Sequence, residues 1–465
     1  MNQSTIIQSV SELLKEIVGE TNLYTDEESL AHYAHDETED FRFYPDVVVK
    51  PGTAEEVSEI VKLCNQYSIP LTPRGAGTGL SGGALPVCKG IVLSMERFNK
   101  IIEIDERNFQ ATVETGVITQ VFQETVAKKG LFYPPDPSSR GSCFIGGNIA
   151  ESSGGPKAVK YGVTKDYILN LQVVLPTGEI IWTGANVLKN ATGFNLTQLM
   201  IGSEGTLGII TKAVTRLIPL PTNDLVMLIP FRSSRQACEA VNAILMTGII
   251  PSALEFMERD ALLWSARHLG LELSVAPDIE AHLLVEVDGN DPESLLRDAE
   301  KIYEAVSVFD IEEPLLGNSS KQKEDLWKLR RNVANAVKEN SVYKEEDTVV
   351  PRAYLPELLV GIKEIGKKYN FNTVCFGHAG DGNLHIFVLK KDQTEDDWKT
   401  KVPEGIRELF QLTVALGGTI SGEHGIGYVQ KPYINIALSE KQLQLMKAIK
   451  SVFDPKGILN PGKIF

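Results

Sequence analysis

Basic side chains, long apolar runs and paired cysteines are all scarce in this chain of 465 residues. Lys and Arg number 46 against 61 Asp and Glu, and the net charge of -15 argues against binding to a nucleic acid backbone or an anionic membrane surface. The longest apolar runs, such as "LVMLIPF", fall far short of the roughly 20 residues that span a bilayer. No basic leader precedes an apolar core, so we recognise no signal peptide and expect a cytoplasmic protein without a transmembrane segment.

The five cysteines lie far apart and form no C-x-x-C pair. This spacing excludes an ordinary iron–sulfur or cysteine-rich zinc site within the chain. Reduced thiols fit the pattern, at Cys64, Cys88, Cys143, Cys238 and Cys375.

The length and an apolar content of 43% predict two or three folded domains. Apolar residues at helical spacing predict an amphipathic helix near the start of an N-terminal segment, residues 1–42. A β-α-β unit follows, with strands at 47–49 and 69–72 and a helix that starts near Thr53.

The proline-rich "LIPLPTND" marks a domain boundary between residues 221 and 222. Residues 222–415 alternate apolar strands with long helices, including 292–308 and 355–369, which predicts an open sheet with helices on one face. Residues 416–465 are again rich in glycine and turns.

Three glycine-rich stretches precede this boundary: "PRGAGTGLSGGALP", "PPDPSSRGSCFIGGNIAESSGGP" and "IGSEGTLGIITKAVTRLIPLP". The first follows a predicted strand, and its composition lets backbone N–H groups surround an anion. It lacks the Gly-Lys-Ser/Thr end of a Walker loop and misses the dinucleotide spacing. A flexible loop is the alternative for the first stretch alone. Three such stretches in one domain suggest a large cofactor that carries phosphate.

Two of the seven histidines, His378 and His385, flank the turn in "GHAGDGNLH". A tight turn that happens to bring two imidazoles together is the alternative to a functional pair. The later "SGEHGIG" adds Glu423 and His424, for which an exposed glycine-flanked loop is the alternative. Two imidazoles and a carboxylate with open positions suit a catalytic zinc or another divalent first-row ion.

Taken in this order, the three glycine-rich stretches resemble the FAD domain of the vanillyl-alcohol oxidase type. The blocks "GHAGDGNLH", "SGEHGIG" and "LNPGKIF" narrow the resemblance to the bacterial D-lactate dehydrogenase and glycolate oxidase catalytic-subunit family, with D-2-hydroxyglutarate dehydrogenases as near relatives. The resemblance implies an α+β fold. An FAD-binding domain (43–221) would be joined to an open-sheet α+β substrate (cap) domain (222–415), and a C-terminal segment (416–465) would return to the flavin.

The resemblance also implies which residues bind FAD. The first stretch would bind the pyrophosphate, the second would run beside the flavin ring, the third would hold the adenosine side, and one C-terminal residue would lie near the isoalloxazine. In that order the residues are Arg74, Gly75, Ala76, Gly77, Thr78, Gly79; Pro135, Asp136, Ser142, Gly146, Gly147, Asn148, Ser153; Glu204, Gly208, Ile210; and Asn460. Some relatives attach the flavin through a histidine in the first stretch, where this chain has Thr78, so we expect noncovalent FAD.

For the chemistry, the resemblance implies one divalent ion, zinc first and iron or manganese as alternatives, held by His378, His385 and Glu423. His424 would take the hydroxyl proton of a small D-2-hydroxy acid while the α-hydrogen leaves as hydride to flavin N5. A helix expected over 325–347 would offer Arg330 for the substrate carboxylate. If the match to the family pattern is shifted by one residue, the helix would also offer Lys344 as a second contact. Arg331 is assigned to a solvated face.

Three functions are compatible with these residues. The first is a dehydrogenase that passes electrons to an electron-transferring flavoprotein, an iron–sulfur subunit or a quinone. The second is an oxidase that uses dioxygen, and the third is a non-catalytic flavin-binding subunit, against which the intact histidines argue.

Two departures from the hydroxyglutarate-type relatives, Phe387 and Ala334, bear on the substrate. If "LHIFVL" is a strand, Phe387 lies on the same side as His385 and would border the metal pocket. An apolar wall disfavours a second substrate carboxylate, which predicts a monocarboxylate, D-lactate ahead of glycolate and D-2-hydroxyglutarate last. The alternative is that Phe387 packs in the core behind the site.

Overall fold

The computed structural model describes residues 3–38, 41–390 and 392–465. The chain divides into two compact units. Unit 1 comprises Met1–Gly154, Val163–Leu220 and Glu423–Phe465, and unit 2 comprises Gly155–Gly162 and Pro221–Gly422. The chain passes between the units after Leu220, beside the predicted boundary, and after Gly422, seven residues beyond the predicted 415. Four residues of the predicted N-terminal segment, 1, 2, 39 and 40, lie outside the described residues.

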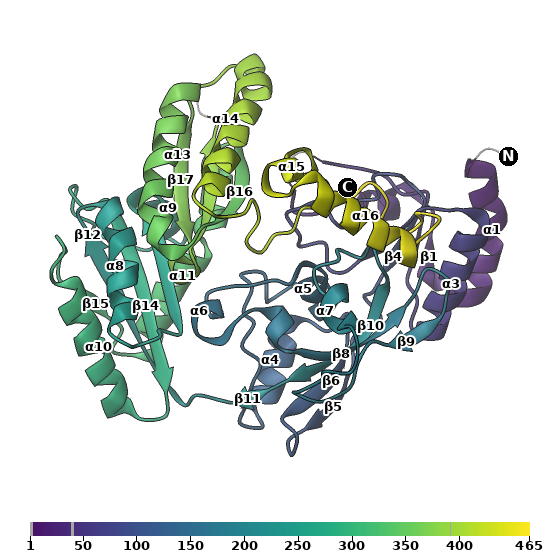
Figure 1. Ribbon diagram of the computed structural model, residues 1–465, viewed down its shortest axis with the longest axis horizontal. Helices are drawn as coiled ribbons and strands as arrows, with labels where there is room; N and C mark the ends of the chain where they lie inside the picture. The colour runs from purple at the N-terminus through teal and green to yellow at the C-terminus, as the bar shows by residue number, and fades with distance from the viewer. Residues whose placement is uncertain (1–2, 39–40, 391) are drawn as a thin grey trace. The chain divides into compact units, whose positions relative to one another are not determined.

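The first sheet of unit 1 contains the predicted β-α-β unit, and Figure 1 labels two strands of this sheet, β1 and β4, and the connecting helix α3. Its strand order is β1 (Leu23–Tyr24), β2 (Val47–Val49), β4 (Ile91–Ser94) and β3 (Leu71–Arg74). β2 and β3 both run parallel to β4, and helix α3 (Ala54–Tyr67) connects them. The side chain of Thr53 accepts a hydrogen bond from the backbone N–H of Glu56, as the N-cap pattern predicts.

Helix α1 (Gln3–Val18) belongs to the core of unit 1. Val10, Leu14 and Val18 recur every four residues and pack in the same apolar cluster as the buried face of α3. A second, antiparallel sheet has the order β5 (Ile101–Asp105), β6 (Gln110–Glu114), β10 (Ile209–Arg216), β8 (Ile168–Val174) and β9 (Ile180–Trp182). The other elements of unit 1 are β7 (Leu131–Phe132), β11 (Ile218–Pro219), α2 (Glu27–His32), α4 (Thr119–Ala127), α5 (Ile145–Glu151), α7 (Leu196–Met200), α15 (Ile434–Ala437) and α16 (Glu440–Phe453).

Unit 2 is built on an antiparallel sheet of seven strands. Their order is β15 (Leu315–Leu316), β12 (Asn223–Phe231), β14 (Ala281–Gly289), β13 (Ala253–Glu258), β17 (Asn372–Gly377), β18 (Asn383–Leu389) and β16 (Tyr343–Val349). The helices of unit 2 are α6 (Ala158–Tyr161), α8 (Ser234–Met246), α9 (Arg259–His268), α10 (Pro292–Val306), α11 (Ser320–Arg331), α12 (Val333–Asn340), α13 (Leu355–Tyr369) and α14 (Glu395–Ala415).

Helices cover both faces of this sheet, so the prediction of helices on one face is wrong. α9, α11 and α12 pack in one apolar cluster with alternate residues of the strands, among them Met257 and Phe376. The opposite face carries Glu258 and Thr373, and both accept hydrogen bonds from Lys363 of α13 at 2.8 and 3.0 Å. Eight of the nine residues of β14 are buried. Burial of residues on both sides of β14, including His282, Glu286 and Asp288, is the pattern of a strand covered on both faces.

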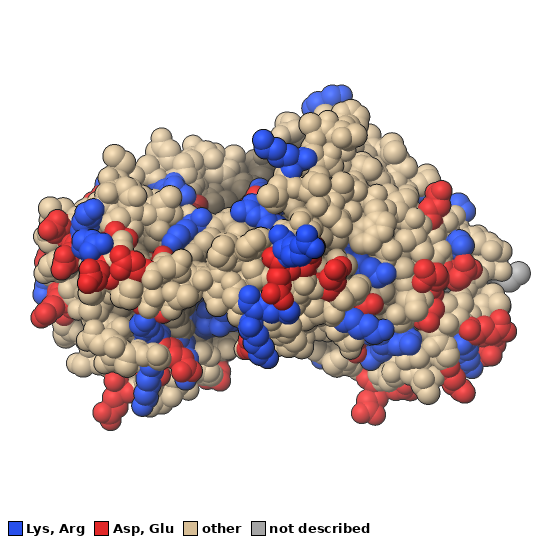
Figure 2. Space-filling model, turned by 90° about the horizontal axis from the view of Figure 1, so that it is seen from below, with Lys and Arg blue, Asp and Glu red and all other residues tan. Residues whose placement is uncertain are grey.

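None of the described helices is both long and apolar enough to cross a membrane. On the face drawn in Figure 2, Lys and Arg side chains are interspersed with Asp and Glu side chains. That face therefore lacks the continuous basic stripe that nucleic-acid-binding proteins present.

Candidate functional site

The turn between β17 and β18 positions His378 and His385. His378 follows the last residue of β17, and His385 is the third residue of β18. Between them, Gly382 has a φ of 78°, and a Cβ there would collide with the carbonyl oxygen of Val350, so the turn requires glycine. Both imidazoles are buried, and their ring centroids lie 5.3 Å apart in an edge-to-face arrangement.

A buried carboxylate on β13, Glu255, contacts both His378 and Arg330. Each carboxylate oxygen of Glu255 lies 2.9 Å from Nδ1 of His378, and Nη2 of Arg330 lies 2.7 Å from Oε2. Burial raises the pKa of Glu255, but the contacts with His378 and the charge of the Arg330 guanidinium outweigh it and hold the pKa below its usual value. Sequence reasoning missed this residue, although a single acidic side chain in the apolar run "SALEFM" is a signal for a buried charge.

Arg330, on α11, lies where the sequence predicts a cation. Its side chain is buried, and its guanidinium carbon lies 4.9 Å from the ring centroid of Phe376. Nε of Arg330 has no hydrogen-bond partner in the part of the chain that the structure describes. The neighbouring Arg331 instead lies over the ring of Trp327, at 4.9 Å. Arg330 therefore retains a buried donor of the kind that binds a carboxylate.

Lys344 does not join this group, and the prediction for it is corrected. The helix expected over 325–347 ends at Asn340, and Lys344 lies on strand β16. Lys344 is opposite Val388 on β18, whereas Asp347 is opposite His385, so Lys344 points to the other face of the sheet. Its Nζ lies 5.9 Å from the ring centroid of Trp398 on α14.

Asp347 anchors the chain segment that leads to Glu423 and His424. Its Oδ2 accepts hydrogen bonds from Ser421 Oγ at 3.0 Å and from the backbone N–H of Gly422 at 2.8 Å. Its Oδ1 accepts one from Asn383 Nδ2 at 2.6 Å. These bonds hold the end of unit 2, Gly422, directly before Glu423 in the chain.

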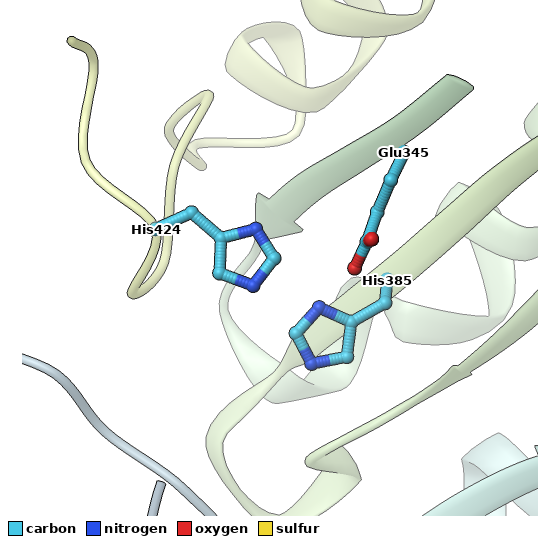
Figure 3. Close-up of side chains that lie close together, drawn as sticks. All are labelled: Glu345, His385 and His424. Carbon is cyan, nitrogen blue, oxygen red and sulfur yellow. The ribbon is translucent and has the colours of Figure 1, made fainter. Parts of the chain in front are cut away.

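The predicted ligand residues belong to different parts of the chain, His378 and His385 to unit 2 and Glu423 to the last segment of unit 1. Ligand atoms of His378, His385 and Glu423 all lie within 4.8 Å of one another. Those of Glu345, His385 and His424 form a second group within the same limit, and Figure 3 shows these three side chains directed toward one another. Glu345 was not predicted. It lies on β16 with Asp347, on the same face as His385.

Phe387 shares the face of His385, as strand alternation predicts, but it does not border an accessible pocket. It is 0% exposed and packs in the cluster with α9, α11 and α12. Its ring lies 5.4 Å from that of Phe376, between centroids, and 5.2 Å from that of Tyr343. The predicted pocket wall is therefore a core residue, as aromatic strand residues usually are. Ala334, on α12, is partly buried against the same cluster.

In unit 1, the predicted FAD residues lie in segments next to β3, α5 and β10. Arg74 ends β3, and Gly75, Ala76, Gly77, Thr78 and Gly79 follow it. Pro135, Asp136 and Ser142 precede α5, Gly146, Gly147 and Asn148 lie on it, and Ser153 follows it. Glu204 and Gly208 precede β10, and Ile210 is its second residue.

Direct contacts join these segments. A Cβ on Gly75 would lie 3.8 Å from the backbone nitrogen of Gly147, and the N–H of Glu204 donates to the carbonyl oxygen of Ala150 at 2.9 Å. The side-chain amide of Asn460 donates to the carbonyl oxygens of Gly83, at 2.9 Å, and Glu204, at 2.7 Å. Other predicted residues bond to residues outside the predicted set: Asn148 donates to Thr119, Asp136 accepts from Arg140, and Ser142 donates to the carbonyl oxygen of Ser139.

The first loop fits an anionic cofactor. Arg74 is buried, yet its Nη1 has no hydrogen-bond partner among the described residues. A Cβ at Gly77 would collide with the Arg74 guanidinium, whereas a Cβ at Gly79 or Gly147 would meet no protein atom within 4 Å. A buried cation beside bare backbone is the chemistry that binds a pyrophosphate.

Buried ionisable groups surround Glu204. Burial raises its pKa to about 7, although the backbone N–H groups of Ile426 and Gly427, which donate to its carboxylate at 2.8 and 2.7 Å, oppose the shift. Burial likewise lowers the pKa of Lys463 to about 8. Glu204 thus holds the segment after His424 in unit 1. The sequence predicts Glu204 as a residue on the adenosine side of FAD, and its bonds to Ile426 and Gly427 were not predicted.

Comparisons with known proteins show the family of the chain. Residues 45–184 match the FAD binding domain family, and residues 220–464 match the family described as FAD linked oxidases, C-terminal domain. The chain is 39% identical to glycolate oxidase subunit GlcD of Bacillus subtilis (strain 168), over 99% of this chain and 97% of that protein. It is 39% identical to a D-lactate dehydrogenase of Anaerostipes hadrus, over 97% and 96%. It is 35% identical to a D-2-hydroxyglutarate dehydrogenase of Stutzerimonas stutzeri (strain A1501), over 97% and 98%.

Among solved structures, p-cresol methylhydroxylase is similar with a TM-score of 0.81 at 19% identity, over 99% of this chain and 97% of that one. This likeness shows the fold, which is the predicted α+β fold with an FAD-binding domain of the vanillyl-alcohol oxidase type. The class is thus a flavoprotein oxidoreductase. The chain belongs to the FAD-linked oxidase family, in the branch that contains glycolate oxidase subunits and D-lactate dehydrogenases.

Proposed function

We propose that this protein oxidises a small D-2-hydroxy acid, D-lactate first and glycolate second, to the 2-oxo acid, with noncovalent FAD and one divalent metal ion. One observation carries the proposal: two buried imidazoles and a buried guanidinium that retains a donor share one carboxylate-lined site on the sheet of unit 2. The names of the relatives agree with this substrate class.

In this proposal each residue has a separate task. His378, His385 and Glu423 would hold the metal ion, which when bound polarises the substrate hydroxyl, and FAD when bound accepts the α-hydrogen as hydride. Arg330 binds the substrate carboxylate, and His424 takes the hydroxyl proton. The substrate thereby loses a proton and a hydride and leaves as the 2-oxo acid.

The number of cations at the site supports a monocarboxylate. Arg330 contacts the carboxylate that orients His378, but Lys344, the second cation that the sequence suggests, points to the opposite face. A second substrate carboxylate therefore could not pair with Lys344, and an unpaired buried charge is costly. D-2-hydroxyglutarate oxidation is the alternative, because one relative has that name.

We further propose that the electrons leave through a partner protein, an electron-transferring flavoprotein or an iron–sulfur subunit, or through a quinone. The cysteine spacing argues against a second redox centre in the chain itself. Direct use of dioxygen is the alternative.

The test is flavin reduction under anaerobic conditions. We expect D-lactate to bleach the flavin absorbance in a single turnover, with a higher kcat/KM than glycolate and D-2-hydroxyglutarate, while L-lactate is inert. Chelation should abolish the reduction and leave the bound FAD in place, and one equivalent of divalent metal should restore it. Equal or better kcat/KM for D-2-hydroxyglutarate would contradict the substrate, and full activity in metal-free protein would contradict the metal site.

A further inference from the structure

Glu255 is a fully buried carboxylate in the middle of the sheet of unit 2. It lies on β13, whose neighbours are β14 and β17, and it is 0% exposed. Strand alternation assigns it to the same face as Ala253 and Met257, which pack in the apolar cluster. A carboxylate at a core position is retained only with strong partners, because its burial is otherwise costly.

The two partners of Glu255 are groups with different tasks in the proposed reaction. Both of its oxygens lie 2.9 Å from Nδ1 of His378, and Oε2 lies 2.7 Å from Nη2 of Arg330. An ionised carboxylate can only accept hydrogen bonds, so Nδ1 of His378 is the donor in this contact, and Nε2 is the nitrogen that can offer a lone pair. A lone pair on Nε2 is what a metal ligand needs.

We propose that Glu255 is a positioning residue that fixes the tautomer and orientation of His378 for the metal and the orientation of Arg330 for the substrate carboxylate. This inference rests on the proposed function, because it assigns Glu255 to the same site. Carboxylates that accept a hydrogen bond from the second nitrogen of a metal-binding histidine raise its basicity and hold the ring in place.

A purely structural ion pair is the competing explanation, and the geometry argues against it. An ion pair needs only Arg330, yet Glu255 places both oxygens at equal distances from His378. Arg330 also keeps its Nε without a hydrogen-bond partner among the described residues, so Glu255 does not use all of the guanidinium donors.

The same strand supplies a matched control. Glu258 is three residues further along β13 and points to the opposite face, where it lies 2.7 Å from Nζ of Lys363 and accepts the N–H of Cys375 at 2.7 Å. Glu258 is therefore a buried, paired carboxylate of the same strand, and its partners among the described residues are Lys363 and the N–H of Cys375 instead of a histidine. Replacing it measures the general effect of losing such a charge.

The experiment measures zinc binding by metal-free holoflavoprotein in wild type, Glu255→Gln and Glu258→Gln, by calorimetry or by competition with a chelator. We expect Glu255→Gln to weaken zinc binding about 10- to 100-fold, the usual effect of removing such a carboxylate. Glu258→Gln should stay within a factor of about two, and FAD content should be equal in all three. Zinc affinity that is equal in Glu255→Gln and Glu258→Gln overturns the inference.

Arg330→Gln separates the two roles of Glu255. It leaves the contact between Glu255 and His378, so zinc affinity should be retained while KM for the substrate rises. If the uncompensated Arg330 keeps Glu255→Gln from folding, the double variant Glu255→Gln/Arg330→Gln removes both charges and should show the same loss of zinc affinity. Wild-type protein that binds no zinc, iron or manganese would overturn the proposed function, and the inference with it. Wild-type binding with an unaltered Glu255→Gln overturns the inference alone.

Discussion

Replacement of Asp347 by alanine tests how the protein holds the segment that leads to Glu423 and His424. The substitution removes three hydrogen bonds to one carboxylate, from Asn383, Ser421 and Gly422, at 2.6 to 3.0 Å. Asp347 is buried, so these bonds are shielded from water. The N–H of Gly422 would lose its acceptor, and the start of the Glu423–His424 segment would lose its anchor.

The size of the stability loss in Asp347→Ala depends on the hydrogen-bond partners that remain. A hydrogen bond to a charged group contributes about 1.5–3 kcal/mol. Asn383 keeps a second bond, to the carbonyl oxygen of Thr348 at 2.9 Å, and the hydroxyl of Ser421 is only partly buried and can turn to water. Loss of the buried charge also removes its desolvation cost. We therefore expect Asp347→Ala to lower the free energy of unfolding of unit 2 by about 2–4 kcal/mol.

Denaturant unfolding and hydrogen exchange measure the two effects separately. Ser421→Ala is the graded control, because it removes one of the three bonds and should cost less than half as much. The amide of Gly422 should exchange faster in Asp347→Ala than in wild type, and the rate of flavin reduction should fall as the anchor of His424 is lost. A change in unfolding free energy below about 1 kcal/mol, with unaltered exchange at Gly422, would refute the anchoring role.

Four further predictions concern other parts of the chain. His424→Asn should lower kcat by about 10²–10⁴-fold with normal FAD and metal content, and unchanged flavin reduction would exclude it as the base. Because Thr78 replaces a linking histidine, acid precipitation should release all FAD, and yellow pellets would contradict this. Glu204 has its pKa raised by burial to about 7 from 4.5. The contribution of Glu204 to the free energy of unfolding is therefore complete below pH 4.5, and about 3 kcal/mol of it is lost as pH rises through 7. Urea unfolding measured as a function of pH should show a smaller loss in Glu204→Gln. Phe387→Ala should lower the free energy of unfolding by about 3–5 kcal/mol without changing the order of kcat/KM for the three acids. A shift of kcat/KM toward D-2-hydroxyglutarate would instead support the prediction that Phe387 borders the substrate pocket.

Much of the fold is predictable because local patterns agree with it. Strand β2 occupies the predicted residues 47–49, the cap at Thr53 appears as expected, and helix α13 occupies the predicted residues 355–369. The glycine-rich loops and the histidine turn are also local signals, because glycine is required where φ is positive or the backbone is crowded.

The parts that could not be predicted depend on distant residues. Charged residues from Tyr343 to Asp347 are typical of a solvated helix, but they form β16 because β18 pairs with them. That pairing turned Lys344 away from the site and brought Glu345 to it. Glu255 was missed for a related reason, since its partner His378 lies 123 residues away.

Unit 2 also contains a short insertion that no local pattern marks. Residues 155–162 are surrounded in sequence by unit 1, but Lys157 pairs with Glu286, and Lys160 pairs with Asp288 at 2.6 Å. This segment belongs to unit 2 because its lysines pair with buried carboxylates on β14, more than 100 positions later in the chain.

The discontinuous units impose an order on folding during synthesis. Everything that unit 2 requires, including residues 155–162, has left the ribosome once residue 422 has emerged. Unit 1 begins first, but Asn460 bonds to Gly83 and Glu204, which were made 377 and 256 residues earlier. Chains grow at about 5–20 residues per second, so the first part of unit 1 waits many seconds for its last segment. The unit that starts second can therefore be completed first, and the FAD-binding unit is exposed to chaperones and proteases for longer.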